Sequence, residues 1–288
     1  MDRVSTSASQ GAGPDRVAPK PKRTPQRISP IWWLQALRRR FTRKAPFGQP
    51  RLIYRAPDTA IVWRPGKSDQ LVVIFQGIQA RPLQPKRLEF KDIAWDQGRF
   101  HVLFVVDRCR SWYSRPGQQD RIVEQIRQFA AAQGISSIRA AGNSMGGYGA
   151  ILFSDRLPIS KVIAFVPQIL MTEEVICHSH WSKNRGNITD EVVRDLTPIL
   201  ARTTSHVHII YGEEDVDDPL HLAHLRREVP DATQVRIVIV PGQDHNVAAW
   251  LKAQGQLAGL VAALWVNDRQ ALETCSRALE KPLDLTLA

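Results

Sequence analysis

The chain has 288 residues, of which 43% are hydrophobic, so it can build a sizeable buried core. Its formal net charge is +11, but residues 1–50 hold 11 Lys or Arg against 2 Asp, while residues 51–288 hold 28 against 26. The basic charge therefore lies mainly in the N-terminal segment, and the nearly neutral remainder argues against a nucleic-acid-binding protein.

Neither a run of 18 apolar residues nor a signal-peptide pattern is found, and the three cysteines are widely spaced. We therefore expect the thiols to be reduced. The protein is expected to lie in the cytoplasm, either in solution or peripheral at the membrane. The cluster from Cys177 to His180 has the composition of half a zinc site, but no second ligand cluster completes it. A polar loop is the preferred interpretation, and neither a metal nor an organic cofactor is expected.

The N-terminal segment is predicted to lie outside the folded domain. Residues 1–30 have the composition of a disordered basic tail. Residues 31–50 follow as a basic amphipathic segment, in which Trp33, Leu37 and Phe41 fall on one helical stripe. One interpretation is that residues 31–44 contact an anionic membrane surface or a protein partner, and the other is that they pack back onto the domain.

Short apolar strands alternate with helices from residue 51 onward. Strands are expected at 51–56, 59–65, 71–77, 100–107, 136–144, 161–168, 206–212 and 235–242, and helices at 121–134, 148–157, 220–229 and 246–265. The first two strands are predicted to form a hairpin, and the alternation predicts an α/β fold with a mostly parallel, doubly wound sheet. Within this domain of residues 51–266, residues 169–205 are expected to form a lid-like insertion, and residues 267–288 a C-terminal helix and tail.

The stretch RAAGNSMGGYGAILF places Ser144 between Gly142 and Gly146, at the junction of a predicted strand and a predicted helix. A G-x-S-x-G sequence in that context is typical of a nucleophile elbow, in which the strained turn admits only small residues two positions before and after the serine. The following helix N-terminus favours negative charge that develops beside the serine. The alternative is a tight strand-to-helix turn without chemistry.

A nucleophilic serine needs a histidine base and a carboxylate that orients it, and in this fold they follow in the order Ser, Asp or Glu, His. His245 follows the last predicted strand and is the histidine placed at the correct sheet edge in that order. Asp215 follows strand 206–212 and is the preferred acid. Its competitors are Glu214, Asp217 and Asp218.

An oxyanion also needs backbone donors. One is expected to be the N–H of Met145, the residue after the nucleophile. The other is expected in the loop after strand 71–77, from Ile78, with Gly77 allowing the backbone to approach and Gln76 holding the loop.

The serine, acid and histidine agree in type, order and context, and over residues 51–266 the chain resembles the α/β-hydrolase family of serine hydrolases. The resemblance implies Ser144 as nucleophile, Asp215 as acid, His245 as base, and Ile78 with Met145 as the oxyanion hole. One position departs from the family: many members have His-Gly in the oxyanion loop, where this chain has Gln76-Gly77.

The substrate contacts are predicted from loops at the same sheet edge. The candidates are Gln76, Asp107, Arg110, Trp112, Tyr113 and Trp181. The aromatic side chains are suited to stacking on a sugar ring or acyl group, and an arginine to binding an anionic substituent. The alternative is that the aromatics pack beneath the lid. The segment VVDRCRSWYSRPG, together with SMGGYGA and FVPQ, also resembles small bacterial α/β-hydrolases that accompany glycan-assembly glycosyltransferases. This resemblance implies an O-acyl ester on a carbohydrate.

The expected function is cleavage of a carboxylic ester through an acyl-enzyme. Acyl transfer to a sugar hydroxyl uses the same residues and stays open as an alternative. The rival from another class is a non-catalytic scaffold with this fold that recruits partners through its basic tail.

Overall fold

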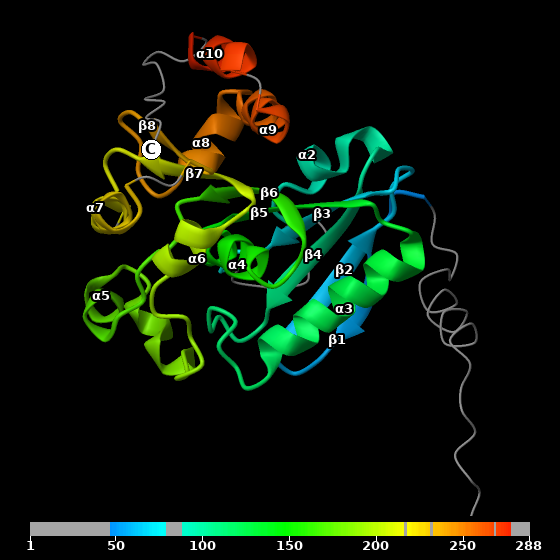
Figure 1. Cartoon of the computed structure of the whole chain (residues 1–288), viewed down its shortest axis with the longest axis horizontal. Coiled ribbons are helices and arrows are strands. Elements are labelled where there is room, and N and C mark those ends of the chain that lie inside the picture. The colour runs from blue at the N-terminus through cyan, green and yellow to red at the C-terminus, as the bar shows by residue number, and fades with distance from the viewer. Residues whose placement is uncertain (1–46, 79–87, 216–217, 231–232, 268, 278–288) are drawn as a thin grey trace, which may run out of the picture.

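The computed structural model describes residues 47–78, 88–215, 218–230, 233–267 and 269–277 (Figure 1). The predicted tail, the amphipathic stripe of residues 31–44 and the last eleven residues lie outside this description. Nothing in the structure bears on the hypothesis of a membrane or partner contact there.

Eight strands form one sheet in the order β1-β2-β4-β3-β5-β6-β7-β8. They are β1 (Arg51–Arg55), β2 (Thr59–Arg64), β3 (Gln70–Phe75), β4 (His101–Asp107), β5 (Ser137–Asn143), β6 (Ile159–Phe165), β7 (His206–Gly212) and β8 (Val235–Val240). β1, β2 and β4 pair antiparallel, whereas every pair from β4 to β8 is parallel. The predicted hairpin and the mostly parallel sheet are both confirmed.

The central strands are apolar along their length because helices cover both faces of the sheet. Every residue of β4 is buried, as are the five residues of β3 that follow Gln70. The helical elements are α2 (Lys91–Trp95), η2 (Asp96–Gly98), α3 (Gln118–Gln133), α4 (Met145–Ser154), α5 (Glu173–His178), η3 (Ser182–Asn187), α6 (Thr197–Arg202), α7 (Asp218–Glu228), α8 (Val247–Ala253), α9 (Leu257–Val266) and α10 (Arg269–Arg277). Figure 1 shows α3 and α4 on one side of the sheet and α2, α8 and α9 on the other.

The single long helix predicted over residues 246–265 is wrong. The segment forms two helices, α8 and α9, whose axes differ by 113°. The break falls at Gly255, which has a φ of +70°, a left-handed conformation that glycine adopts without steric cost. Both helices still bury an apolar side, which is the periodicity that made the segment resemble one helix.

The insertion at 169–205 consists of α5, η3 and α6 joined by short loops, with an isolated bridge between Leu170 and Asp195. It packs through buried apolar side chains, among them Ile176, Trp181 and Leu196. The insertion is therefore a packed part of the molecule beside the sheet edge where β6 ends.

No single helix in the described ranges is long and apolar enough to cross a membrane. The bent pair of α8 and α9 reaches that length and composition only when its two halves are taken together.

Candidate active site

Ser144 lies in a sharp turn between the end of β5 and the start of α4. Its φ of 55° and ψ of −121° are strained for a residue with a side chain. The neighbouring glycines make the turn possible. A Cβ at Gly142 would lie 2.1 Å from the Gly146 carbonyl oxygen, and one at Gly146 would lie 2.1 Å from the Phe75 carbonyl oxygen. The requirement for small residues at these two positions is therefore steric, and α4 begins at Met145, three residues earlier than predicted.

The loops after β7 and β8 bring an acid and a histidine to this turn. His245 Nε2 lies 3.0 Å from Ser144 Oγ, and His245 Nδ1 lies 3.1 Å from Asp215 Oδ2. The two loops also hold each other, because the Glu214 N–H donates to the Gln243 carbonyl oxygen at 2.8 Å. A Cβ at Gly212 would lie 2.3 Å from that same oxygen, so the end of β7 must be glycine for the loops to meet.

Among the candidate acids, the structure brings Asp215 to His245. The Asp215 side chain is buried, whereas Glu214 is exposed. Asp217 and the side chain of Asp218 lie outside the described residues. A carboxylate at this distance can orient an imidazole and stabilise its protonated form.

Gln168, which was not predicted as a site residue, also contacts the serine. It lies three residues beyond the end of β6 and is almost fully buried. The Trp112 indole N–H, which can only donate, points at Gln168 Oε1 over 3.0 Å. This contact orients the amide so that Nε2 donates to Ser144 Oγ at 3.3 Å and to the Val166 carbonyl oxygen at 3.4 Å. The signal for it in the sequence is an amide side chain just after a strand that ends at the same sheet edge as β5.

The segment Gln76–Gly77–Ile78 lies against the elbow. A Cβ at Gly77 would lie 2.8 Å from the Asn143 carbonyl oxygen, so glycine permits the close approach expected of it. The N–H of Gly77 is not aimed at the site, because it donates to Glu89 Oε2 at 2.8 Å. The N–H groups of Ile78 and Met145 are accordingly the candidate oxyanion donors.

Most of the predicted substrate contacts are instead built into the protein interior. Asp107 is buried, and its carboxylate accepts N–H groups from Cys109, Ser111 and Tyr113, so it shapes its own loop. Gln76 is fully buried and accepts the Glu89 N–H at 3.0 Å. These contacts place both side chains in loop support rather than on a substrate surface.

The aromatic candidates pack in the way the alternative interpretation described. Tyr113 is fully buried against Phe75 and Phe153, and burial, followed by nearby Asp107, raises the pKa of its hydroxyl well above the ordinary value. Trp112 is fully buried and lies against Trp181 of the insertion, with ring centroids 4.6 Å apart. Arg110, two residues before Trp112 in the chain, is half-buried and has a φ of 57°. We call the pair of Trp112 and Trp181, which meets Gln168 through the Trp112 indole N–H, the tryptophan wall.

His180 gives the insertion a second contact with the site. Its ring meets that of His245 edge to face, with centroids 4.6 Å apart. The polar loop predicted from Cys177 to His180 is wrong in its first half, because Cys177 and His178 form the end of α5 and only Ser179 and His180 lie beyond the helix. Across the described part of the chain, no three His, Cys, Asp or Glu side chains are arranged to hold a metal ion.

Compared by sequence, the chain matches no protein-family model and no curated protein. Its structure resembles esterase Est2 of the planctomycete Thermogutta terrifontis, solved with butyrate, at a TM-score of 0.57 and 15% identity over 77% of this chain and 94% of that one. It also resembles the capsule O-acetyltransferase of Neisseria meningitidis serogroup A, at a TM-score of 0.54 and 16% identity over 75% and 97%. A third similar structure is Est1E from Butyrivibrio proteoclasticus, at 0.53 and 12% over 75% and 99%. At these identities the likeness concerns the fold, and the chain has the α/β-hydrolase fold.

Proposed function

We propose that the chain is a serine hydrolase that cleaves a carboxylic ester through an acyl-enzyme. The observation that carries this proposal is the line of contacts from Asp215 through His245 to Ser144, whose Oγ sits in a strained elbow at the end of β5. Nucleophile, base and orienting acid within this reach of one another form the arrangement that activates a serine hydroxyl.

The reaction follows from these positions. Ser144 Oγ attacks the ester carbonyl carbon as its proton passes to His245 Nε2. The N–H groups of Ile78 and Met145 stabilise the oxyanion, and the carbon–oxygen bond to the alcohol breaks as His245 returns the proton to the leaving oxygen. Water then attacks the acyl-enzyme while His245 takes its proton, and the carboxylic acid leaves as Ser144 regains a hydrogen.

An O-acyl group on a carbohydrate is the proposed ester. The support is the similarity in fold to a capsule O-acetyltransferase and to an esterase solved with butyrate, together with the sequence resemblance to hydrolases of glycan assembly.

Turnover of p-nitrophenyl acetate and butyrate by the wild type and by Ser144→Ala tests the proposal. We expect the wild type to hydrolyse both esters and to label with a fluorophosphonate probe, and the variant to do neither. The matched control is Ser154→Ala, at the far end of α4, which is expected to behave as wild type. Wild-type protein that is folded but neither turns over nor labels would favour the non-catalytic scaffold.

Acyl transfer is the second candidate, and the similarity in fold to a capsule O-acetyltransferase favours it. With p-nitrophenyl acetate as donor and methyl glycosides as acceptors, a transferase produces acetylated glycoside, which mass spectrometry detects. A hydrolase produces only acetate and leaves the glycosides unchanged.

A further inference from the structure

The oxyanion segment is held at Gln76 by three contacts from three parts of the fold. The Gln76 N–H donates to the Val105 carbonyl oxygen of β4 at 2.9 Å. The Tyr113 hydroxyl donates to the Gln76 carbonyl oxygen at 3.5 Å, and Gln76 Oε1 accepts the Glu89 N–H at 3.0 Å. The residue two positions before Ile78 is therefore fixed through its N–H, its carbonyl and its side chain.

Glu89 completes a reciprocal pair with this segment. The Gly77 N–H donates to Glu89 Oε2 at 2.8 Å, and the Glu89 N–H donates to Gln76 Oε1. Gly77 and Glu89 are twelve residues apart in sequence, so these contacts join the end of β3 to the residue before the N-cap of α2. A hydrogen bond to a carboxyl group is among the stronger ones available to a backbone N–H.

Glu89 and the elbow backbone enclose Gly77 from two sides. A Cβ at Gly77 would lie 2.8 Å from the Asn143 carbonyl oxygen and 3.1 Å from Glu89 Oε1, so Gly77 is enclosed between the elbow backbone and the carboxyl group. Ile78 follows this enclosed glycine directly. The Ile78 N–H belongs to the peptide group that follows Gly77. Its direction therefore depends on where Glu89 holds the Gly77 N–H.

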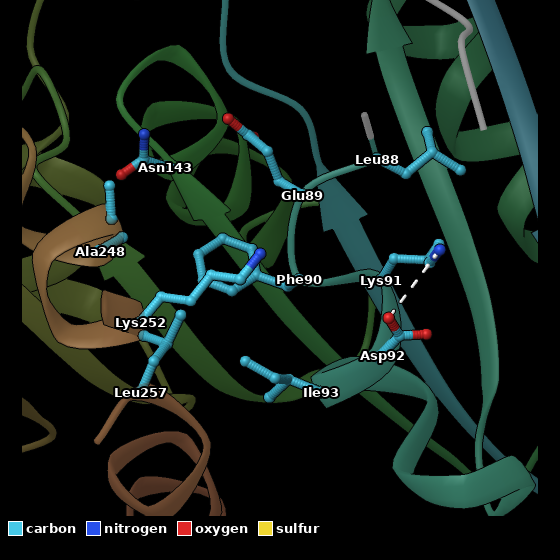
Figure 2. Close-up of a pocket in the computed structure, with 11 residues that line it drawn as sticks. Leu88, Glu89, Phe90, Lys91, Asp92, Ile93, Asn143, Ala248, Lys252 and Leu257 are labelled. Carbon is cyan, nitrogen blue, oxygen red and sulfur yellow. Dashed lines mark ion pairs between the residues drawn. The ribbon is translucent and has the colours of Figure 1, made fainter. Parts of the chain in front are cut away.

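The Glu89 side chain reaches this position beside a pocket of about 380 Å³ between α2 and α8. Figure 2 shows Glu89 and Asn143 at one end of the pocket, and Ile93 and Leu257 at the other. The charged side chains that share its lining are Lys91, Asp92 and Lys252. Burial raises the pKa of Glu89 to about 7, although the hydrogen bond from the Gly77 N–H acts to lower it. The surroundings therefore disfavour the charged carboxylate. Groups with perturbed pKa values cluster at functional sites.

We propose that Glu89 is a positioning residue for the oxyanion hole, which holds the Gly77 peptide so that the Ile78 N–H faces the carbonyl oxygen of the substrate. This inference rests on the proposed function, since it assumes that Ser144 attacks a carbonyl group. Glu89 itself touches no reacting atom. Its effect is exerted through the geometry of Gly77 and Ile78.

The test compares Glu89→Ala with Glu89→Gln, whose amide oxygen keeps an acceptor for the Gly77 N–H. A misplaced catalytic group costs on the order of 100-fold in rate, so Glu89→Ala is expected to lower kcat about 10- to 100-fold with little change in KM. Glu89→Gln is expected to stay within about 3-fold of wild type by the same reasoning. Asp96→Asn, an exposed carboxyl on the neighbouring η2, is the matched control and is expected to change nothing.

Hydrogen exchange of the peptide that contains Gly77 and Ile78 gives a readout independent of activity. We expect faster exchange there in Glu89→Ala and wild-type exchange in Glu89→Gln. Unchanged exchange in Glu89→Ala, or a kcat of Glu89→Gln as low as that of Glu89→Ala, overturns the proposal. If exchange is faster in Glu89→Ala but the wild type hydrolyses no ester, the contact between Glu89 and Gly77 is supported and the proposed function is contradicted.

Discussion

The elbow and the insertion both border Ser144, but they are held in different ways. The elbow is enclosed by backbone atoms: Gly146 lies against the Phe75 carbonyl, and the Ser144 N–H donates to the Phe165 carbonyl at 2.8 Å. The insertion reaches the site through side-chain rings, with Trp181 on Trp112 and His180 on His245. Backbone contacts admit no substitution at the elbow, whereas ring contacts tolerate change. The elbow is therefore suited to conserve the chemistry, and the insertion to adjust it.

The largest expected effect is that of a single methyl group at the elbow. Gly146→Ala places a carbon within 2.1 Å of a backbone oxygen and is expected to destabilise the fold by roughly 3 kcal/mol or more and to abolish activity. Gly186→Ala in the insertion is the matched control, because nothing lies within 4 Å of the added carbon. Urea unfolding of both variants measures the difference. Equal stabilities would contradict the contrast between the two regions.

Asp215→Asn tests the acid that the β7 loop brings to His245. The substitution keeps the shape but removes the charge that stabilises protonated His245, so kcat is expected to fall by about 10⁴-fold with stability little changed. Glu214→Gln, the exposed neighbour, is the control and is expected to leave kcat unchanged. If instead Glu214→Gln loses the activity and Asp215→Asn keeps it, the acid has been misassigned.

The pH dependence of the free energy of unfolding tests the Glu89 carboxyl group, which contacts Gly77 beside the elbow. Its folded-state pKa is raised to about 7 from the ordinary 4.5, so the folded protein holds the proton more tightly than the unfolded chain. Stability from this group is complete below about pH 4.5 and is lost as pH rises to 7, by roughly 1–2 kcal/mol after allowance for partial exposure. Glu89→Gln should remove this part of the slope in urea titrations at pH 5 and 7. A slope identical to that of the wild type would show that Glu89 does not titrate in this range.

Gln168→Ala measures the contact that links the elbow to the tryptophan wall. Loss of one neutral hydrogen bond to Ser144 Oγ is expected to lower kcat about 3- to 10-fold. Trp112→Phe keeps an aromatic ring of smaller size but loses the indole N–H that orients the amide, so it should reproduce part of the loss. A Gln168→Ala enzyme with wild-type kcat would reduce the amide to a packing role.

The smallest effect is expected from His180→Ala in the insertion. An edge-to-face ring contact contributes about 0.5–1.5 kcal/mol, and His180 is exposed, so kcat should change by about 3-fold or less without a change in melting temperature. Steady-state kinetics on p-nitrophenyl acetate measures it. A loss comparable to that of Asp215→Asn would place His180 in the chemistry and erase the distinction between the two regions.

The elements of the sheet and the order of Ser144, Asp215 and His245 could be predicted because they depend on local patterns. Apolar runs predicted the strands, and the glycines around Ser144 predicted the turn. The break at Gly255 escaped prediction, since a helical periodicity continues on both sides of it. The positions of Gln168, His180 and Glu89 escaped it too, because each depends on a contact between segments distant in sequence. The aromatic residues after β4 carried no signal that distinguished a binding surface from a buried wall.

The placement of Tyr113 has a consequence for how the chain folds. Its ring packs against Gly149, where a Cβ would lie 2.5 Å from the ring, and its hydroxyl meets the backbone of Gln76. We therefore expect the elbow to close only once the ends of β3 and β4 and the start of α4 have met, because such non-local contacts form slowly. In a refolding experiment, far-ultraviolet circular dichroism should recover before the serine becomes reactive. A newly made chain would then show no reactivity at Ser144 until its sheet and elbow have formed.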